Sequence, residues 1–352
     1  MSDNTPNSKK IEALLAKKKA HAASLNVDEL SSKIFAGDFK ALSETITLIE
    51  STNQQKSEIG QAVVAKCLNK NTDAIRIGIT GVPGVGKSTF IESFGLYLVN
   101  KGLKVAVMAI DPSSEKSHGS ILGDKTRMNK LAVHPNAFIR PTASSGSLGG
   151  VARNTRETIF LCEAAGFDII LIETVGVGQS ETAVHSMTDF FLLLMLAGAG
   201  DELQGIKRGI MEMADAILIT KADGENVKMA NMARSEYKNA LHLFPANDNE
   251  WIPKVETVSS IETRGIEKAW DIVDAFNRLT ISNGSKQANR NQQEVYWMNE
   301  TVKENLLKEF YQTDGIEAEL TKIQSELIDG KITSYRAAEK IIKYYHERKR
   351  TI

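Results

Sequence analysis

The sequence predicts an α/β fold in which a largely parallel central sheet carries helical extensions at both ends. Two observations lead to this prediction. From Asp73 to about Thr280, short apolar runs rich in β-branched residues alternate with longer helical stretches, which is the pattern of βαβ units. The region from about Lys9 to Lys70, by contrast, is rich in Ala, Leu, Lys and Glu, and no proline occurs after Pro253. We therefore expect an N-terminal helical extension at 1–70, an α/β domain at 71–281 and a C-terminal helical arm at 282–352.

Seven apolar runs are candidate strands of the sheet. Because they are nearly continuous in apolar residues, we expect the sheet to be buried on both faces and largely parallel. In chain order the runs are Ala74–Thr80, Lys104–Ile110, Ala137–Arg140, Asp168–Glu173, Asp189–Leu196, Ala216–Thr220 and Lys254–Ser259.

Composition limits the class of partner. The 352 residues include 43 basic and 44 acidic side chains, so the net charge gives no reason to expect nucleic acid or an anionic membrane as partner. The longest apolar run, Phe190–Ala197, is too short to span a bilayer. Cys67 and Cys162 stand far apart and are expected to be buried thiols in a reducing compartment. The first 20 residues are polar and lysine-rich, which favours a cytoplasmic protein.

The C-terminal arm is predicted from helical periodicity. A polar stretch from Ser282 to Asn289 is typical of a linker. Beyond it, Val295, Met298, Val302 and Leu306 recur at helical spacing. A last helix is expected to begin near Thr333 or Ser334. Such an arm serves either core packing or oligomerisation, and we favour a homodimer.

A glycine-rich loop between the first strand and the next helix predicts a phosphate site. It fits the pattern G-x-x-x-x-G-K-[ST], so the domain is expected to be a P-loop nucleotide-hydrolase domain of the GTPase type. Its glycines let backbone N–H groups turn toward phosphate oxygens, and the following helix adds its positive end. The lysine is placed to reach the β- and γ-phosphates, and the serine to ligate Mg²⁺. The nucleotide-binding residues of the loop are Gly81, Val82, Pro83, Gly84, Val85, Gly86, Lys87, Ser88 and Thr89.

Carboxylates at other strand ends predict the magnesium side of the site. Glu173 ends an apolar run, and Gly176 follows where a backbone N–H can approach the γ-phosphate. Small GTPases carry Asp at this position, and the longer Glu suggests contact through water or a displaced ion. Asp111 follows the second strand, and Asp124 lies in the loop beyond it. With Ser88, these three acids are the candidate metal ligands; for Asp111 and Asp124 a helix cap or a turn is the alternative.

The sixth strand ends in a motif that favours guanine. In Thr220-Lys-Ala-Asp223, the carboxylate can accept from N1–H and N2–H₂ of guanine, while the stem of Lys221 covers the ring. Thr220 stands where GTPases usually carry Asn. After the seventh strand, Ser259, Ser260 and Ile261 can offer backbone N–H groups to the guanine carbonyl. For Lys221 and Asp223, a solvated turn after the strand is the alternative. The expected ligands are GTP or GDP with Mg²⁺.

Several longer motifs resemble a known family. They are Asp111-Pro-Ser-Ser114, the segments 119–128 and 145–153, Glu173-Thr-Val-Gly-Val-Gly-Gln-Ser-Glu181 and the segment 198–213. Over about residues 60–280 these motifs resemble the MeaB/ArgK/MMAA GTPases, which are chaperones of adenosylcobalamin-dependent acyl-CoA mutases.

This resemblance implies a GTPase that forms a homodimer through its C-terminal helices. It also implies a partner, methylmalonyl-CoA mutase or a close relative, whose cofactor loading the GTPase gates and which it protects or reactivates. Carried over by position, Lys87, Asp124 and Glu173 are the catalytic candidates, with Asp124 positioning the attacking water. Leu196–Lys207 resembles the family's additional switch loop, in which Asp201, Glu202 and Lys207 could form or break ion pairs.

Two other functions are alternatives. One is a kinase that serves amino-acid transport, which the guanine motif disfavours. The other is a nickel-inserting GTPase, which the scattered histidines disfavour. Intrinsic hydrolysis is expected to be slow, because beside Gly176 only Gln179, Arg127 and Arg153 are weak candidates for completing catalysis.

Overall fold

The computed structural model describes residues 26–68, 70, 73–110, 128–141, 148–174, 180–198, 204–244 and 249–349. The chain divides into two compact units, Met1–Gln293 and Glu294–Ile352. The division into three parts at residues 70 and 281 remains a prediction.

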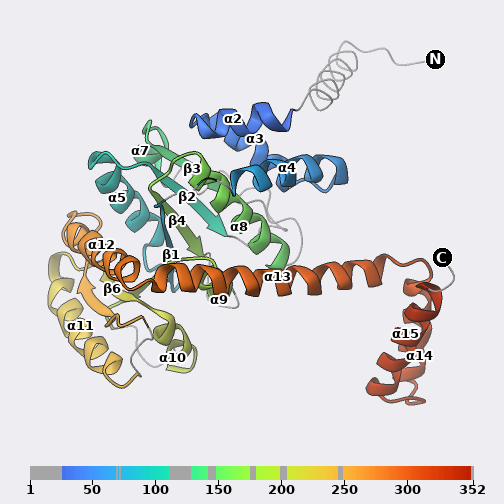
Figure 1. The fold of residues 1–352 in the computed structure, drawn as a ribbon. Helices are drawn as coiled ribbons and strands as arrows, with labels where there is room; N and C mark the ends of the chain where they lie inside the picture. The colour runs from blue at the N-terminus through green and yellow to red at the C-terminus, as the bar shows by residue number, and fades with distance from the viewer. Residues whose placement is uncertain are drawn as a thin grey trace, which may run out of the picture. The chain divides into compact units, whose positions relative to one another are not determined.

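A seven-stranded sheet forms the centre of the first unit (Figure 1). All neighbouring strands are parallel, and their order is β3-β2-β4-β1-β5-β6-β7. The predicted α/β fold with a parallel sheet is thus confirmed, and each predicted strand is present. The strands are β1 (Ile75–Gly81), β2 (Val105–Ile110), β3 (Ala137–Pro141), β4 (Ile169–Thr174), β5 (Phe190–Leu196), β6 (Ala216–Thr220) and β7 (Lys254–Thr257).

Helices cover both faces of the sheet, because the strands present apolar side chains to each side in alternation. Along β5, Phe190, Leu192 and Leu194 pack with α5, α7 and α12 on one face. Leu193 and Met195 pack with α10 and α11 on the other face, where α8 and α9 contact β1, β2 and β4. The helices are α5 (Lys87–Asn100), α7 (Asn129–Ala132), α8 (Leu148–Ala164), α9 (Ser180–His185), α10 (Gln204–Met213), η3 (Gly224–Asn226), α11 (Val227–Leu241) and α12 (Ile266–Ser282).

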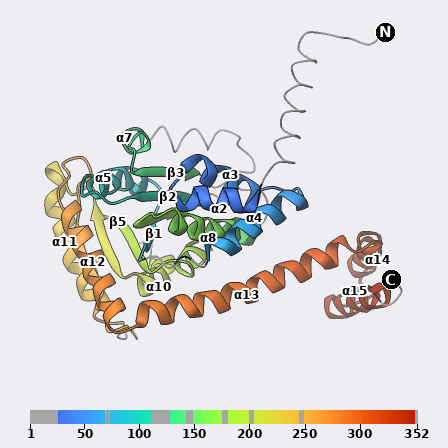
Figure 2. The same cartoon turned by 45° about the horizontal axis from the view of Figure 1, so that its top comes forward.

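Three N-terminal helices lie against α8 and do not enter the sheet (Figure 2). They are α2 (Val27–Phe35), α3 (Phe39–Ile49) and α4 (Gln54–Cys67). Each begins after an Asn or Asp whose side chain accepts from a backbone N–H of the first turn: Asn26, Asp38 and Asn53. Local capping therefore sets where these helices start, and burial of Leu42, Ile46 and other apolar residues holds them in place.

The predicted linker from Ser282 to Asn289 is wrong. Only Asn283 and Gly284 separate α12 from α13 (Ser285–Gln312). The Asn283 Oδ1 accepts from the N–H of Ser285 at 3.0 Å and so caps the new helix. The polar residues that follow form its first turns, which belong to the first unit and bond to other parts of it.

The second unit consists of the rest of α13 with α14 (Ile316–Ile328) and α15 (Ser334–Lys349). Its small core contains Ile316, Ile323, Ala337 and Ile341. The predicted start of the last helix is confirmed: α15 begins at Ser334, and the Thr333 hydroxyl accepts from the Arg336 N–H at 3.3 Å. In the part of the chain described, no helix has the length and apolar character needed to cross a membrane.

An aspartate precedes each of the strands β4, β5 and β6, and its carboxylate accepts a backbone N–H at the amino end of the sheet. The carboxylate of Asp168, before β4, accepts from the Lys104 N–H at 2.7 Å. Asp189, before β5, accepts from the Arg76 N–H at 2.9 Å. Asp215, before β6, accepts from the Phe191 N–H at 2.8 Å. Each carboxylate thereby pairs an N–H at the amino end of an adjacent strand.

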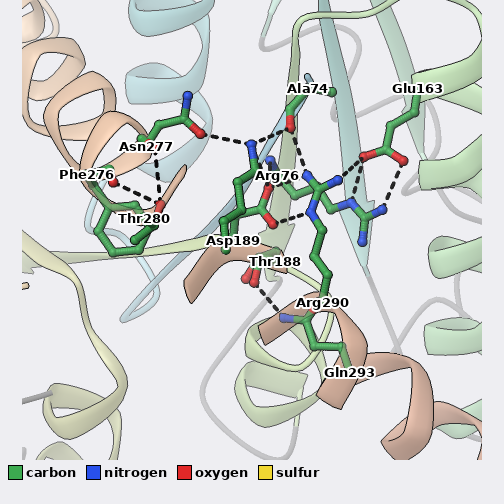
Figure 3. A network of polar contacts seen from close by, with 11 residues as sticks. Ala74, Arg76, Glu163, Thr188, Asp189, Phe276, Asn277, Thr280, Arg290 and Gln293 are labelled. Atoms are coloured by element: carbon green, nitrogen blue, oxygen red, sulfur yellow. Dashed lines mark hydrogen bonds and ion pairs between the residues drawn. The ribbon is translucent and has the colours of Figure 1, made fainter. Parts of the chain in front are cut away.

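Asp189 belongs to a buried ionic network (Figure 3). Arg290 of α13 donates to Asp189 at 2.6 Å, and Arg76 of β1 makes two hydrogen bonds to Glu163 of α8. Arg290 also lies 3.4 Å from Glu163, and Lys286 lies 4.0 Å from Asp189. Burial raises the pKa of Asp189, but the hydrogen bond and charge of Arg290, with the charges of Arg76 and Lys286, outweigh burial and hold the pKa below its usual value. The network thus joins the start of α13 to the base of the sheet.

We predict that Arg290→Met destabilises the protein by about 3 kcal/mol, because it leaves buried carboxylates short of a cation. Urea unfolding at fixed protein concentration measures the change. Arg278→Met is the matched control, because Arg278 pairs with Asp274 on the surface with 77% of its side chain exposed, and it should not move the midpoint. Equal midpoints for the two variants would contradict a stabilising role for the network.

Candidate functional site

The phosphate loop joins β1 to α5 through a turn with special backbone geometry. A Cβ on Gly81 would lie 2.5 Å from the Leu194 carbonyl oxygen, so the end of β1 packs too closely against β5 for any larger residue. Gly86 is the N-cap of α5 with a φ of 96°, in the left-handed region that favours glycine. Pro83 and Gly84 are exposed at the tip, whereas Val85 is buried. The nine predicted residues from Gly81 to Thr89 therefore run from the last residue of β1 through the turn to the first turn of α5, which presents a helix N-terminus.

Lys87 occupies the first position of α5 and is only 8% exposed. Its Nζ donates to the Gly81 carbonyl oxygen at 2.8 Å, which folds the side chain back over the loop. Burial lowers the pKa of Lys87, while the carboxylates of Glu173 and Glu181 raise it; the net pKa lies below the usual value. The ammonium group thus lies beside the loop, with two carboxylates close enough to act on it.

Ser88 and Glu173 meet at the carboxyl ends of the strands. The Ser88 hydroxyl donates to Glu173 Oε1 at 3.2 Å, and Glu173 is 6% exposed at the end of β4. Hydroxyl and carboxylate oxygens are the donors that Mg²⁺ prefers, so this pair fits the predicted ion. Asp111, Asp124 and Gly176 lie outside the described residues, as do Arg127 and Gln179.

Among the residues that the structure describes, no group of three or more His, Cys, Asp or Glu side chains could hold a metal. Mg²⁺ beside phosphate needs only one or two protein carboxylates. The donor set of Ser88 and Glu173 is therefore compatible with an ion that shares its ligands with a nucleotide.

The end of β6 is tied directly to the phosphate loop. The Thr220 hydroxyl lies 2.8 Å from the Val85 carbonyl oxygen and 3.2 Å from that of Met195. Thr220 is buried, and the next residue, Lys221, has a φ of 54°, which is uncommon for a non-glycine residue. The hydroxyl of the unusual threonine thus links the Lys221–Asp223 segment to the loop at Gly81–Thr89.

Asp223 is held by a neighbour in the loop after β7. The Ser259 hydroxyl donates to Asp223 Oδ2 at 2.7 Å, and Ser259 is fully buried. The Ser260 carbonyl oxygen accepts from the Ser93 hydroxyl of α5 at 2.8 Å. Ile261 is 81% exposed. The structure therefore brings the two predicted base-binding segments together and attaches both to the phosphate loop and its helix.

Four contributions at this site were not predicted from sequence. Glu181 of α9 is 1% exposed and acts electrostatically on Lys87. The Thr220, Ser93 and Arg264 side chains each bond a backbone carbonyl oxygen, and Arg264 reaches that of Ala222 at 2.6 Å. For Thr220 the only signal was a short polar residue at the end of an apolar strand, which is too common to single it out, and nothing local indicated the contacts of the other three side chains.

The predicted switch segment Leu196–Lys207 is described only in part. β5 ends at Leu196, residues 199–203 lie outside the described residues, and α10 begins at Gln204. Asp201 and Glu202 are among the residues not described, and the side chain of Lys207 is not described either.

Arg153, one of the weak candidates for completing catalysis, lies on α8, 3.9 Å from Glu157 of the same helix.

Comparison with known proteins identifies the family. The profile described as Methylmalonyl Co-A mutase-associated GTPase MeaB matches residues 42–314. The chain is 47% identical over 317 residues to a probable GTPase of Mycobacterium tuberculosis, covering 90% of this chain and 94% of the relative. It is 43% identical over 332 residues to the mouse protein named methylmalonic aciduria type A homolog, mitochondrial, and the match covers 92% of this chain and 80% of the relative. It is 45% identical over 281 residues to the GTPase ArgK of Escherichia coli, and the match covers 80% of this chain and 85% of the relative.

A solved structure agrees with these matches. The crystal structure described as LAO/AO transport system kinase superposes with a TM-score of 0.74 at 34% identity, covering 92% of this chain and 99% of that chain. The chain therefore belongs to the MeaB family of methylmalonyl-CoA mutase-associated GTPases, and the P-loop GTPase predicted from its sequence is confirmed.

Proposed function

We propose that the protein is a GTP-hydrolysing chaperone that binds an adenosylcobalamin-dependent acyl-CoA mutase, methylmalonyl-CoA mutase or a close relative. In this role it gates cofactor loading and protects or reactivates the mutase. The observation that carries the proposal is the match of residues 42–314 to a family described as mutase-associated. The names of the mouse and Caenorhabditis elegans relatives point to the same metabolism. The buried thiols of Cys67 and Cys162 are compatible with a cytoplasmic location.

Asp223 selects guanine in this proposal. Its carboxylate accepts from the N1–H and N2–H₂ groups of the base, and adenine offers no such pair of donors. Ser259 holds one carboxylate oxygen at 2.7 Å and so fixes the direction of the other. Backbone N–H groups of Ser260 and Ile261 approach the guanine carbonyl, and Lys221 covers the ring. The predicted contribution of the Ser259 N–H is wrong, because that group donates to the Arg264 carbonyl oxygen at 2.9 Å.

Lys87, Glu173 and Asp124 act on the phosphates. Lys87 leaves the Gly81 carbonyl oxygen to contact the β- and γ-phosphates, where its charge stabilises the transition state. Ser88 and Glu173 would hold Mg²⁺, with Asp111 and Asp124 as further candidate ligands, and the bound ion would supply positive charge to the phosphates. Asp124 orients the attacking water, and the N–H of Gly176 approaches the γ-phosphate and responds when that phosphate leaves.

The segment Leu196–Lys207 carries the nucleotide signal to the mutase in this proposal. It follows β5, which lies beside β1 in the sheet, so its first residues start next to the phosphate loop. The Cε of Met229 on α11 lies 3.3 Å from where a Cβ on Gly198 would stand. Met229 and Met232 are more than half exposed on that helix. An apolar surface thus adjoins the segment that we assign to partner contact.

The arm provides the contact of a homodimer. On α13, Val295, Met298, Val302 and Leu306 are each more than half exposed and recur at helical spacing. An exposed apolar stripe of this length is costly in water and is typical of a protein interface. We assign this stripe to the homodimer.

The first test measures GTP hydrolysis by the purified protein, alone and with a purified adenosylcobalamin-dependent mutase from the same cell. We expect slow turnover alone and an acceleration of about tenfold or more with the mutase, because a partner can order groups that complete catalysis. ATP should give no acceleration. Lys87→Ala should keep its circular dichroism spectrum and lose turnover, because the lysine acts on phosphate.

Two outcomes would argue against the proposal. GTP turnover unaffected by every such mutase would leave the GTPase without this client. Stable phosphate transfer from ATP to a transport-binding protein, without preference for GTP, would favour the kinase function instead.

A second prediction concerns the base. Asp223→Asn should bind xanthosine triphosphate more tightly than GTP, because the amide can donate to the extra carbonyl of xanthine. Ser259→Ala should keep the guanine preference but weaken GDP binding about fivefold, because Asp223 loses a donor. Ser260→Ala is the matched control, since only its backbone carbonyl is bonded. Equilibrium nucleotide binding measures all three; unchanged GTP affinity in Asp223→Asn would refute the base assignment.

A third prediction concerns the dimer. Val302→Glu should convert a dimer to a monomer in sedimentation velocity, because a charge in a buried apolar contact is costly. Lys308→Glu changes an exposed side chain on the same helix away from the stripe and should leave the mass unchanged. A monomeric wild-type protein, or a Val302→Glu variant that remains dimeric, would refute this assignment.

A further inference from the structure

A second cavity lies at the amino-terminal edge of the sheet, at the opposite ends of the strands from the phosphate loop. Its volume is about 670 Å³, within the usual range of small-molecule sites. Phe191, Met213 and Phe276 give it an apolar wall, and Thr280 and Asn289 are among its polar residues. Figure 3 shows Phe276 and Thr280 beside the ionic network of Asp189. The proposed GTPase mechanism does not use this cavity.

Asp215 lines this cavity and is 9% exposed. Its Oδ2 accepts from the Phe191 N–H at 2.8 Å, which fixes the carboxylate against β5. Within the described part of the chain, its Oδ1 has no hydrogen-bond partner. One carboxylate oxygen is thus held by the backbone, and the other is left for a donor that enters the cavity.

The contrast with Asp189 shows what Asp215 lacks. Both precede a strand, both are buried and both accept a backbone N–H from the adjacent strand. Asp189 is paired with Arg290 at 2.6 Å, whereas no Lys, Arg or His among the described residues lies within ion-pair distance of Asp215. Burial therefore raises the pKa of Asp215 to about 7, and the Phe191 hydrogen bond only partly offsets this effect. Buried carboxylates in proteins normally have a positive partner.

We propose that this cavity binds an organic cation, with Asp215 pairing a primary ammonium or guanidinium group and the apolar wall taking the attached alkyl stem. The apolar wall and the single free carboxylate oxygen favour one cationic head on a short chain. The group can come from a free small molecule or from a lysine or arginine side chain of a partner protein. Both sources present the same chemistry to Asp215.

The other charged groups of the cavity leave this assignment intact. Lys286 already donates to the Ala74 carbonyl oxygen and to Asn277 Oδ1. Asp189 is paired with Arg290, and Glu212 is an exposed carboxylate that adds to the negative potential. Burial lowers the pKa of His185, so it stays neutral near pH 7 and does not repel a cation.

The test uses the full-length protein and n-butylammonium as the probe, with saturation-transfer NMR to measure binding. We expect saturable millimolar binding to the wild type and no binding of butan-1-ol, which has the same stem without charge. Asp215→Asn should bind at least about tenfold more weakly, because the amide keeps the acceptor for the Phe191 N–H but loses the charge. Asp168→Asn is the matched control, since Asp168 holds the corresponding position before β4 and does not line the cavity; its affinity should equal that of the wild type.

The wild type alone provides a second measurement. Because only the ionised carboxylate attracts the probe, affinity should rise about tenfold from pH 6 to pH 8 as Asp215 loses its proton. Absence of saturable binding, equal affinity in Asp215→Asn or affinity independent of pH would each overturn the proposal.

A capped pentapeptide with one central lysine distinguishes the two sources. Binding of both probes with the same dependence on Asp215 indicates that a partner's side chain fits the cavity. Binding of n-butylammonium with exclusion of the peptide indicates a free small cation. Neither result alters the proposed GTPase function, because the cavity and the phosphate loop lie at opposite ends of the strands.

Discussion

The parallel hydrogen bonding of the sheet is the interaction on which the rest of the molecule depends. Because all seven strands run the same way, their carboxyl ends share one edge and their amino ends share the other. The groups that we assign to nucleotide follow β1, β4, β6 and β7, so they meet at the first edge although the sequence separates them widely. Covering helices bury both faces, which leaves the two edges as the places where polar groups can gather.

The amino edge presents a different physical problem. The first N–H groups of a strand need acceptors, and a neighbouring strand supplies carbonyl oxygens only along the length over which the two strands pair. An aspartate before β4, β5 and β6 provides the acceptor in each case. Each of these aspartates places a carboxylate at the amino edge of a buried sheet, and the three carboxylates have different surroundings. Asp168 is solvated, Asp189 is surrounded by cations, and Asp215 is buried beside a cavity.

Local patterns explain why much of the fold was predictable. A strand buried on both faces is a continuous apolar run in the sequence. The phosphate loop is a short contiguous motif whose glycines are required by the local backbone geometry. The seven strands and the start of α15 followed from such patterns. The linker was wrong because Asn283, Gly284 and Ser285 are typical both of a loop and of a tight turn that caps a helix. Only the burial of Lys286 and Arg290 against distant residues decides between the two.

Long-range contacts explain what sequence could not give at the candidate site. Thr220 bonds a carbonyl oxygen 135 positions away, and Ser93 bonds one 167 positions away. Nothing local to either residue indicates its partner. In the same way, the sequence places Glu181 in a motif but does not show that it acts on Lys87. A role that depends on distant residues meeting at one edge of the sheet can be seen only in the folded structure.

The attachment of β6 to the phosphate loop also limits how a nucleotide signal can leave the site. β1 is buried along its whole length and pairs with β4 and β5, while Arg76 near its start is bonded to Glu163. Thr220 then fastens the base-binding segment to the same loop. The segments that we assign to guanine and to phosphate are therefore joined to one another, and a relative shift between them would break buried hydrogen bonds. β4 and β5 flank β1 in the sheet, so the chain segments that follow these two strands start on either side of the phosphate loop. This starting position beside the phosphate loop is the reason for our proposal that the residues after Glu173 and Leu196 form the switch.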